Sequence, residues 1–124
     1  MRKYLWILLS LFTIIVSFTN SSFAKEEVNV YSYRQSILID PFFEEFTNST
    51  GIKVNVLHAK KGLLERLLAE GTDTPADLVL TVDIARLSQF VKEDVLVPIK
   101  SSILTSNIPS HLRDINNHWF SLSK

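Results

Sequence analysis

The strongest constraint on the fold lies in residues 28–57, where two β-branched runs flank an amphipathic helical pattern. Valines at alternate positions mark both runs, and this spacing is typical of β-strands. Between the runs, Leu38, Phe42 and Phe46 recur every four residues, which predicts a helix with one apolar stripe. A strand, a helix and a strand within about thirty residues predict a βαβ unit with parallel strands and a right-handed crossover.

The alternation of strand and helix patterns continues along the chain. Leucines at helical spacing over residues 63–68 predict a second helix, and Gly71 is placed to end it. The apolar run 76–82 predicts a third strand that is buried on both faces, as strands of parallel sheets are. Asp83 then has the position of an N-cap for a third helix with apolar residues over 84–91. The pattern predicts an α/β fold with a parallel sheet flanked by helices.

The pattern is weaker in the last quarter of the chain. A short extended piece is expected over residues 95–99, where Pro98 ends it, and an extended aromatic run begins at His118. This run stops at Lys124 on entry to what we expect to be a further strand. We therefore expect a truncated α/β fold.

The first 24 residues have the three parts of a secretory signal peptide. A basic start is followed by an apolar run over residues 4–18, and the small residues Ser22 and Ala24 precede the expected cut. The apolar run is shorter than the roughly twenty residues that a membrane-spanning helix needs. We expect cleavage after Ala24, a domain of residues 25–124, and export to the periplasm. Without cysteine the chain has no lipid-attachment site and no disulfide framework.

The charge balance argues against a nucleic-acid partner. Residues 25–124 carry 11 basic and 13 acidic side chains, a net charge of −2. Nucleic-acid binding proteins instead gather basic side chains on one face.

The sequence lacks the common signatures of catalysis. It has no cysteine, no Gly-x-Ser-x-Gly nucleophile motif and no glycine-rich phosphate loop. The three histidines, His58, His111 and His118, do not have metal-ligand spacing. We therefore predict that the protein is not an enzyme.

The polar loop after the first strand is the first candidate for a binding site. Tyr33, Arg34 and Gln35 offer a phenol, a guanidinium and an amide at the carboxyl end of this strand, where parallel sheets bind ligands. Arg34 and the free N–H groups of the following helix suit an anion. Asp83 is a second candidate. Both have simpler alternatives: Arg34 extends into solvent while Tyr33 covers an apolar edge, and Asp83 is only a helix cap.

Several separated segments together resemble the periplasmic ferric-iron-binding proteins, the solute receptors of iron(III) ABC importers. The segments are Val-Asn-Val-Tyr-Ser-Tyr-Arg-Gln (28–35), Phe-Thr-Asn-Ser-Thr-Gly-Ile-Lys-Val (46–54), Lys-Gly (61–62), Glu-Gly-x-x-x-Pro-Ala-Asp (70–77), Leu-Thr-Val-Asp-Ile-Ala-Arg-Leu (80–87), Ile-Pro-Ser-His-Leu-Arg-Asp (108–114) and Asn-His-Trp-Phe-Ser-Leu-Ser-Lys (117–124). The resemblance covers residues 25–124.

The resemblance implies a type II periplasmic-binding-protein fold of two lobes that close on Fe3+, with this chain as the first part of lobe one. It also implies a membrane permease of an ABC importer as partner. The family's strand order, 2-1-3, would place residues 32–35 beside residues 81–83 at one cleft. Fe3+ prefers hard oxygen donors, so Tyr33 is the candidate metal ligand.

This sequence departs from the family at several ligand positions. Gln35 and Val82 stand where family members often place a His and a Glu, and the Tyr-Tyr pair of the second lobe is absent. We therefore expect the chain alone to bind no iron, and we expect its uncovered strand edges and apolar faces to be exposed. Two alternatives remain: a receptor for another small anion or solute, and a small exported interaction module without a ligand.

Overall fold

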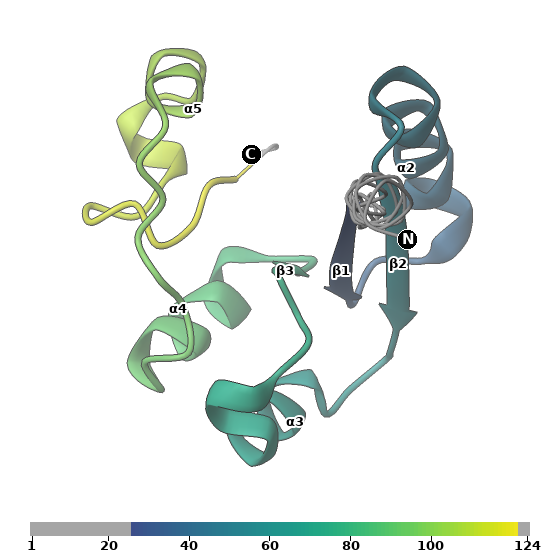
Figure 1. Ribbon diagram of the computed structural model, residues 1–124. Helices are drawn as coiled ribbons and strands as arrows, with labels where there is room; N and C mark the ends of the chain where they lie inside the picture. Colours follow the sequence, from purple (N-terminus) through teal and green to yellow (C-terminus); the bar gives the residue numbers. More distant parts are fainter. Residues whose placement is uncertain (1–25, 122–124) are drawn as a thin grey trace, which may run out of the picture.

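The computed structural model describes residues 26–121, so the predicted signal peptide lies outside the described residues. A three-stranded parallel sheet carries helices on both of its faces (Figure 1). In chain order the elements are β1 (Glu27–Ser32), α2 (Ser36–Thr50), β2 (Lys53–His58), α3 (Leu63–Glu70), η2 (Gly71–Asp73), β3 (Leu78–Leu80), α4 (Ile84–Lys92), α5 (Ser102–Asn107) and η3 (Ser110–Leu112). No helix of residues 26–121 is long and apolar enough to cross a membrane.

The βαβ unit predicted from the sequence is confirmed. β1 and β2 are parallel, with Val30 opposite Val56, and α2 connects them. Gly51 ends α2 in the left-handed conformation, with φ of 75°, and its N–H donates to the Thr47 carbonyl. Glycine adopts this conformation without the steric cost of a side chain, so the chain can turn directly into β2.

The predicted 2-1-3 strand order is also confirmed. α3 returns the chain to the free side of β1, where β3 pairs in parallel with Tyr31 opposite Val79. The first crossover thus starts from the central strand β1, whereas the second runs from β2 past β1 to β3. This order brings the carboxyl ends of β1 and β3 together, which is the arrangement that creates a crevice in open parallel sheets.

The third strand is shorter and more exposed than predicted. The apolar run 76–82 forms only three residues of strand, and its expected burial on both faces is wrong, because Leu78 is 41% and Val82 45% exposed. β3 pairs only with β1 among the described residues, and α2 does not extend over it. An apolar run is buried only where another element covers it, and here that cover is absent from residues 26–121.

The core lies on the face of the sheet that α3 and α4 cover. Its buried members are Tyr31 from β1, Leu63 and Leu67 from α3, and Phe90 from α4. These side chains come from three elements that are far apart in sequence. Their packing fixes the positions of α3 and α4 against the sheet.

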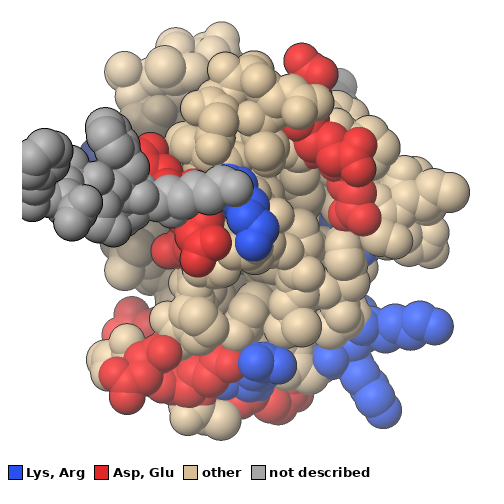
Figure 2. Space-filling view, turned by 45° about the vertical axis from the view of Figure 1, so that its right-hand side comes forward, with Lys and Arg blue, Asp and Glu red and all other residues tan. Residues whose placement is uncertain are grey.

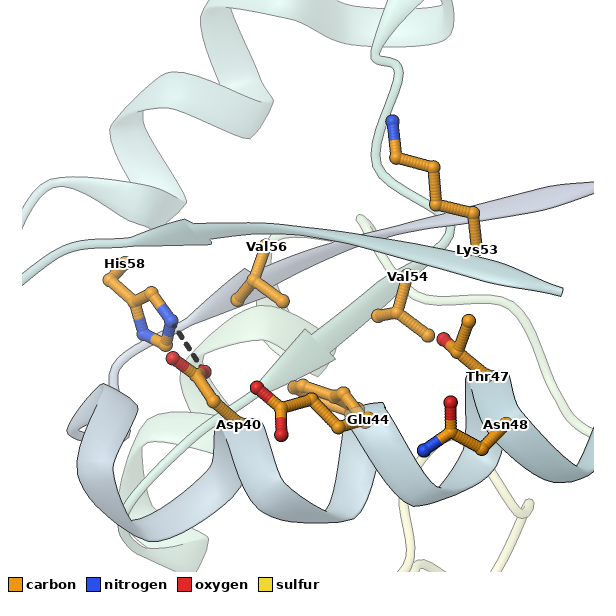
Figure 3. Close-up of a pocket in the computed structure, with 9 residues that line it drawn as sticks. Asp40, Glu44, Thr47, Asn48, Lys53, Val54, Val56 and His58 are labelled. Atoms are coloured by element: carbon orange, nitrogen blue, oxygen red, sulfur yellow. Dashed lines mark hydrogen bonds and ion pairs between the residues drawn. The ribbon is translucent and has the colours of Figure 1, made fainter.

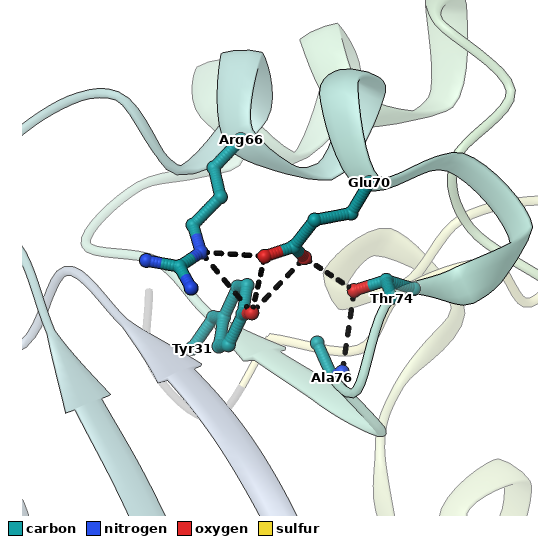
Figure 4. A network of polar contacts seen from close by, with 5 residues as sticks. All are labelled: Tyr31, Arg66, Glu70, Thr74 and Ala76. Atoms are coloured by element: carbon teal, nitrogen blue, oxygen red, sulfur yellow. Dashed lines mark hydrogen bonds and ion pairs between the residues drawn. The ribbon is translucent and has the colours of Figure 1, made fainter.

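A polar network closes the outer side of this core (Figure 4). The Tyr31 hydroxyl donates to the Glu70 carboxylate at 2.9 Å, while Arg66 Nε and Thr74 Oγ1 each donate to that carboxylate at 2.7 Å. The Arg66 guanidinium also lies 5.2 Å from the centre of the Tyr31 ring. The hydrogen bond from Thr74, followed by those from Arg66 and Tyr31, holds the pKa of Glu70 below its ordinary value.

The last quarter of the described chain contains little regular structure. The expected extended piece over residues 95–99 is not a strand, and the aromatic run contributes one antiparallel bridge, Arg113 with Phe120. Within this turn, Asp114 Oδ2 lies 2.7 Å from His118 Nδ1, and this contact lowers the pKa of Asp114. In Figure 1 the segment around α5 stands on the side of the molecule opposite α2.

Candidate functional site

The structure brings the two candidate loops together at the carboxyl ends of β1 and β3. The Tyr33 N–H donates to the Leu80 carbonyl at 2.9 Å, and Arg34 Nε donates to the Thr81 carbonyl at 3.1 Å. Ser32 is fully buried, and its hydroxyl oxygen accepts the Arg34 N–H at 3.0 Å. These bonds tie the loop to the end of the neighbouring strand, as the strand order predicts.

Arg34 and Asp83 both line a large apolar groove beside this junction. The groove has a volume of about 860 Å3 and lies between α2, the sheet and the start of α4. The bond from Nε to Thr81 fixes the Arg34 guanidinium at the edge of the groove. A guanidinium held in this way can recognise an anion through its remaining N–H groups.

Tyr33 does not point into this groove. Its phenolic oxygen accepts the Leu63 N–H at 2.9 Å, and its half-buried ring packs beside the core under α3. Gly62 stands at the N-cap of α3 and has no side chain to satisfy the first N–H groups of the helix. The Tyr33 hydroxyl, from the loop after β1, accepts one of these N–H groups instead. The chain therefore separates the phenol of Tyr33 from the guanidinium of Arg34.

Asp83 caps α4, as its position in the sequence predicts. Its Oδ1 accepts the Arg86 N–H at 2.8 Å, and its Oδ2 lies 3.5 Å from Arg86 Nε. The Arg86 guanidinium also lies 4.5 Å from the centre of the Tyr33 ring. Arg86 thus connects two candidate residues that do not touch each other. Its position three residues after the cap was the available sequence signal for this role.

Gln35 occupies the N-cap position of α2 and is exposed. Its side chain makes no capping hydrogen bond, while its carbonyl accepts the Leu38 N–H at 3.0 Å. Its amide is therefore exposed at the start of α2, although Gln35 is not among the residues that line the groove. Of the four candidate residues, Gln35 has the fewest contacts that fix its side chain.

A second hollow lies between α2 and the edge strand β2, and both polar and apolar side chains line it (Figure 3). His58 Nε2 lies 3.0 Å from Asp40 Oδ1, and His58 Nδ1 lies 3.1 Å from the Arg34 carbonyl. In Figure 3, the side chains of Asp40 and Glu44 on α2 point toward β2. The side chain of Lys53, at the start of β2, points away from α2. No sequence pattern predicted this contact between His58 and the loop.

These groups do not form a metal site by themselves. Among residues 26–121, no three His, Cys, Asp or Glu side chains lie close enough together to hold a metal ion. The arrangement can orient an anion through Arg34, but it offers no ready cage for Fe3+.

Comparison with known proteins identifies relatives of this chain, although no family model matches it. Iron uptake protein A1 of Synechocystis sp. is 41% identical over 101 residues, which are 81% of this chain and 28% of that protein. Ferric iron-binding protein A of Mannheimia haemolytica, solved in an open conformation, is 50% identical with a TM-score of 0.74. The predicted resemblance to the ferric-iron-binding proteins is confirmed.

The fold class predicted from that resemblance is confirmed as well. A Trichodesmium protein solved in complex with iron and citrate ligands is 40% identical, with a TM-score of 0.71 over 76% of this chain. The parallel sheet with flanking helices is thus part of a type II periplasmic-binding-protein fold. This chain spans 30% of the Mannheimia and Trichodesmium structures and 28% of the Synechocystis protein.

Proposed function

We propose that this chain supplies the first part of lobe one of an exported iron(III) receptor. In this proposal the complete receptor binds Fe3+ in the periplasm and delivers it to the membrane permease of an ABC importer, without catalysis. The observation that carries the proposal is the 50% identity to a ferric iron-binding protein of the same fold. The pattern of a signal peptide in residues 1–24 supports export.

Within this proposal, Arg34 holds an anion that accompanies the iron. Its guanidinium lies at the groove edge, held by the Thr81 carbonyl, and the exposed Gln35 and the first N–H groups of α2 follow Arg34 in the chain. The Trichodesmium relative was solved with both iron and citrate, so a metal with an anionic companion is an established combination for a protein of this fold.

The proposed role of Tyr33 is that of an iron ligand, and its geometry limits that role. Its oxygen already accepts the Leu63 N–H, but a phenol oxygen has a further lone pair for another partner. Asp83 can assist through the carboxylate lone pairs that its contacts with Arg86 leave free. We therefore assign the main ferric ligands of the receptor to polypeptide that this chain does not span.

It follows that the isolated chain should not retain ferric iron. Firm binding of Fe3+ needs several anionic oxygen donors that converge on one point, and among residues 26–121 no three His, Cys, Asp or Glu side chains converge in this way. We expect no phenolate-to-iron absorption band when ferric citrate is added to the purified chain. The Mannheimia protein in the same assay is the positive control.

A chimera tests the positive half of the proposal. In it, this chain replaces the matching 30% of the Mannheimia protein, and we expect the product to bind one Fe3+ and to show the absorption band. A stable band at one iron per isolated chain would show that the ligand set is wrongly assigned. A well-folded chimera that binds no iron would contradict the receptor function.

A further inference from the structure

The ring of His58 has an oxygen acceptor at each of its two nitrogens. Nδ1 lies 3.1 Å from the Arg34 carbonyl, and Nε2 lies 3.0 Å from Asp40 Oδ1 (Figure 3). A carbonyl oxygen and an ionised carboxylate can only accept hydrogen bonds. A neutral imidazole has one N–H and can donate to one of these oxygens, whereas an imidazolium has two and can donate to both. Both contacts are therefore hydrogen bonds only when the ring is protonated.

These two contacts lie at the two ends of residues 34–40, which we call the anion segment. Arg34 begins this segment, and Asp40 ends it in the second turn of α2. Between them lie Gln35 and the first N–H groups of α2, which the proposed function assigns to an anion together with Arg34. A single side chain of β2, His58, thus contacts both ends of the segment.

The helix itself gives the anion segment little support. Gln35 at the N-cap makes no capping bond through its side chain, and the first turn of α2 has no acidic residue. Pro41 has no N–H, so the Ile37 carbonyl lacks its usual partner within the helix. Among residues 26–121, the contact with His58 is the only hydrogen bond or ion pair that joins an α2 side chain to another strand or helix. The position of the segment therefore depends on His58.

The charged groups that face the His58 ring are carboxylates of α2. Asp40 and Glu44 point toward β2, whereas Lys53 points away from α2. Arg34 presents its carbonyl to the ring, and its guanidinium is held at the end of β3. On the face shown in Figure 2, acidic and basic side chains lie in several separate groups rather than in one charged field, so the nearest groups dominate. The His58 and Asp40 side chains are 31% and 43% exposed, so the pair can exchange protons with solvent.

From these observations we infer that His58 is a positioning residue, and that its protonation clamps the anion segment against β2. The imidazolium donates to the Arg34 carbonyl through Nδ1 and to Asp40 through Nε2. When the ring loses one proton as the pH rises, one of these contacts loses its hydrogen and the segment loosens. The function of the segment in holding an anion rests on the proposed function, but the clamp does not. The receptor then holds its anion more firmly at pH 5.5 than at pH 8, on either side of the ordinary range of histidine.

Amide hydrogen exchange tests the clamp in the isolated chain, without iron or an anion. The N–H groups of Arg34 and Leu38 donate to oxygens of the loop and report on the segment. After correction for the intrinsic exchange rate, both should be about two- to tenfold more protected at pH 5.5 than at pH 8, the effect of one hydrogen bond. The amide of Leu67, a buried residue of the core, is the reference and should keep its protection.

Asp40→Asn separates the proton dependence from the contact itself. The new side-chain amide can donate to Nε2, so a neutral His58 with its proton on Nδ1 has partners on both sides. We expect this variant to be as protected as the parent at pH 5.5 and to show no difference at pH 8. Nitrogen NMR of the ring should find the Nδ1–H tautomer at pH 8.

Two further variants complete the test. His58→Ala should have the lower protection of Arg34 and Leu38 at both pH values, because both contacts are removed. His111→Gln changes an exposed histidine of η3 outside the clamp, and it should keep the pH profile of the parent.

Three results would contradict the inference. They are equal protection of the anion segment at the two pH values, a difference that persists in Asp40→Asn, and a difference that the Leu67 amide shares. The chimera carries the same segment and gives the same measurement if the isolated chain aggregates. None of these results depends on ferric iron, so a chimera that shows the clamp but binds no iron would contradict the receptor function alone.

Discussion

The two faces of the sheet differ in cover, although both are apolar. On the face under α3 and α4, Tyr31 is 4% and Phe90 1% exposed. On the α2 face, Val30 of the central strand is also 1% exposed, whereas Leu78 of β3 is 41% exposed. The two faces therefore differ in the exposure of apolar side chains at β3 and along α2, although these elements are as apolar in sequence as the core.

This comparison separates hydrophobicity from burial. Phe42 and Phe90 are the same residue type on amphipathic helices of the same sheet, with exposures of 70% and 1%. α4 meets α3 and β1, but the outer part of the α2 stripe meets no element of the described chain. Burial thus depends on the partner that an apolar surface finds. We call the face under α3 and α4 the closed face, and the α2 face the open face. The closed face stabilises the chain, whereas the apolar side chains of the open face remain partly uncovered.

The largest expected effect comes from truncating a phenylalanine on each face. Phe90→Ala removes a side chain from the centre of the core and should lower the free energy of unfolding by about 3–5 kcal/mol. Phe42→Ala removes a side chain that is mostly in solvent and should change it by no more than about 0.5 kcal/mol. Urea unfolding followed by circular dichroism measures both variants.

Equal losses in the two variants would contradict the comparison, because they would mean that the isolated chain covers Phe42 in solution. A small domain has a total stability of about 5–15 kcal/mol, so the Phe90 variant is expected to be partly unfolded even without urea. Phe90→Leu keeps most of the volume and provides a folded variant with a smaller loss.

The local parts of this structure could be predicted well from the sequence, since they depend on neighbouring residues. The alternating valines, the stripe of Leu38, Phe42 and Phe46, and the cap at Asp83 each determine an element within a few positions. The strand order came from the resemblance to a family, and with it the meeting of Arg34 and Thr81.

The parts that failed depend on distant residues. The burial of β3 required a covering element, which no pattern within the run itself can reveal. The bond from the Leu63 N–H to the Tyr33 phenol also joins distant residues, so neither segment alone predicts it, and the role of Tyr33 as an iron ligand stays a prediction. Arg86 escaped notice because its contact with the Tyr33 ring exists only after α4 packs against the sheet.

A smaller effect is expected from the polar network of the closed face, and it depends on pH. Because the folded state lowers the pKa of Glu70, the network contributes stability at pH values above the ordinary value of 4.5, and that stability is lost as the pH falls through the lower folded value. Glu70→Gln should therefore lose less of its free energy of unfolding than the parent chain between about pH 5 and pH 3.

Glu65 provides a matched control on the same helix, since no hydrogen bond or ion pair joins it to the rest of residues 26–121. Glu65→Gln should keep the pH dependence of the parent chain. Urea midpoints at a series of pH values would reveal the difference. The closed face would have been wrongly described if Glu70→Gln and Glu65→Gln gave the same curve.

The smallest effect concerns the border between the closed face and the proposed ligand site. Tyr33→Phe removes the acceptor of the Leu63 N–H and leaves this donor at the start of α3 without a protein partner. The expected loss in the free energy of unfolding is about 0.5–1.5 kcal/mol, the usual contribution of one hydrogen bond. The isolated chain can show this loss in urea, independently of iron.

The same substitution in the chimera decides whether Tyr33 also serves the open side of the molecule. If the phenol only caps α3, ferric iron should bind the substituted chimera as tightly as the parent, although the protein unfolds at less urea. If the phenol also binds iron, the affinity should fall by much more than the stability does, because Fe3+ loses one of its hard oxygen donors. A chimera with unchanged affinity would remove Tyr33 from the iron site and leave it a purely structural role between β1 and α3.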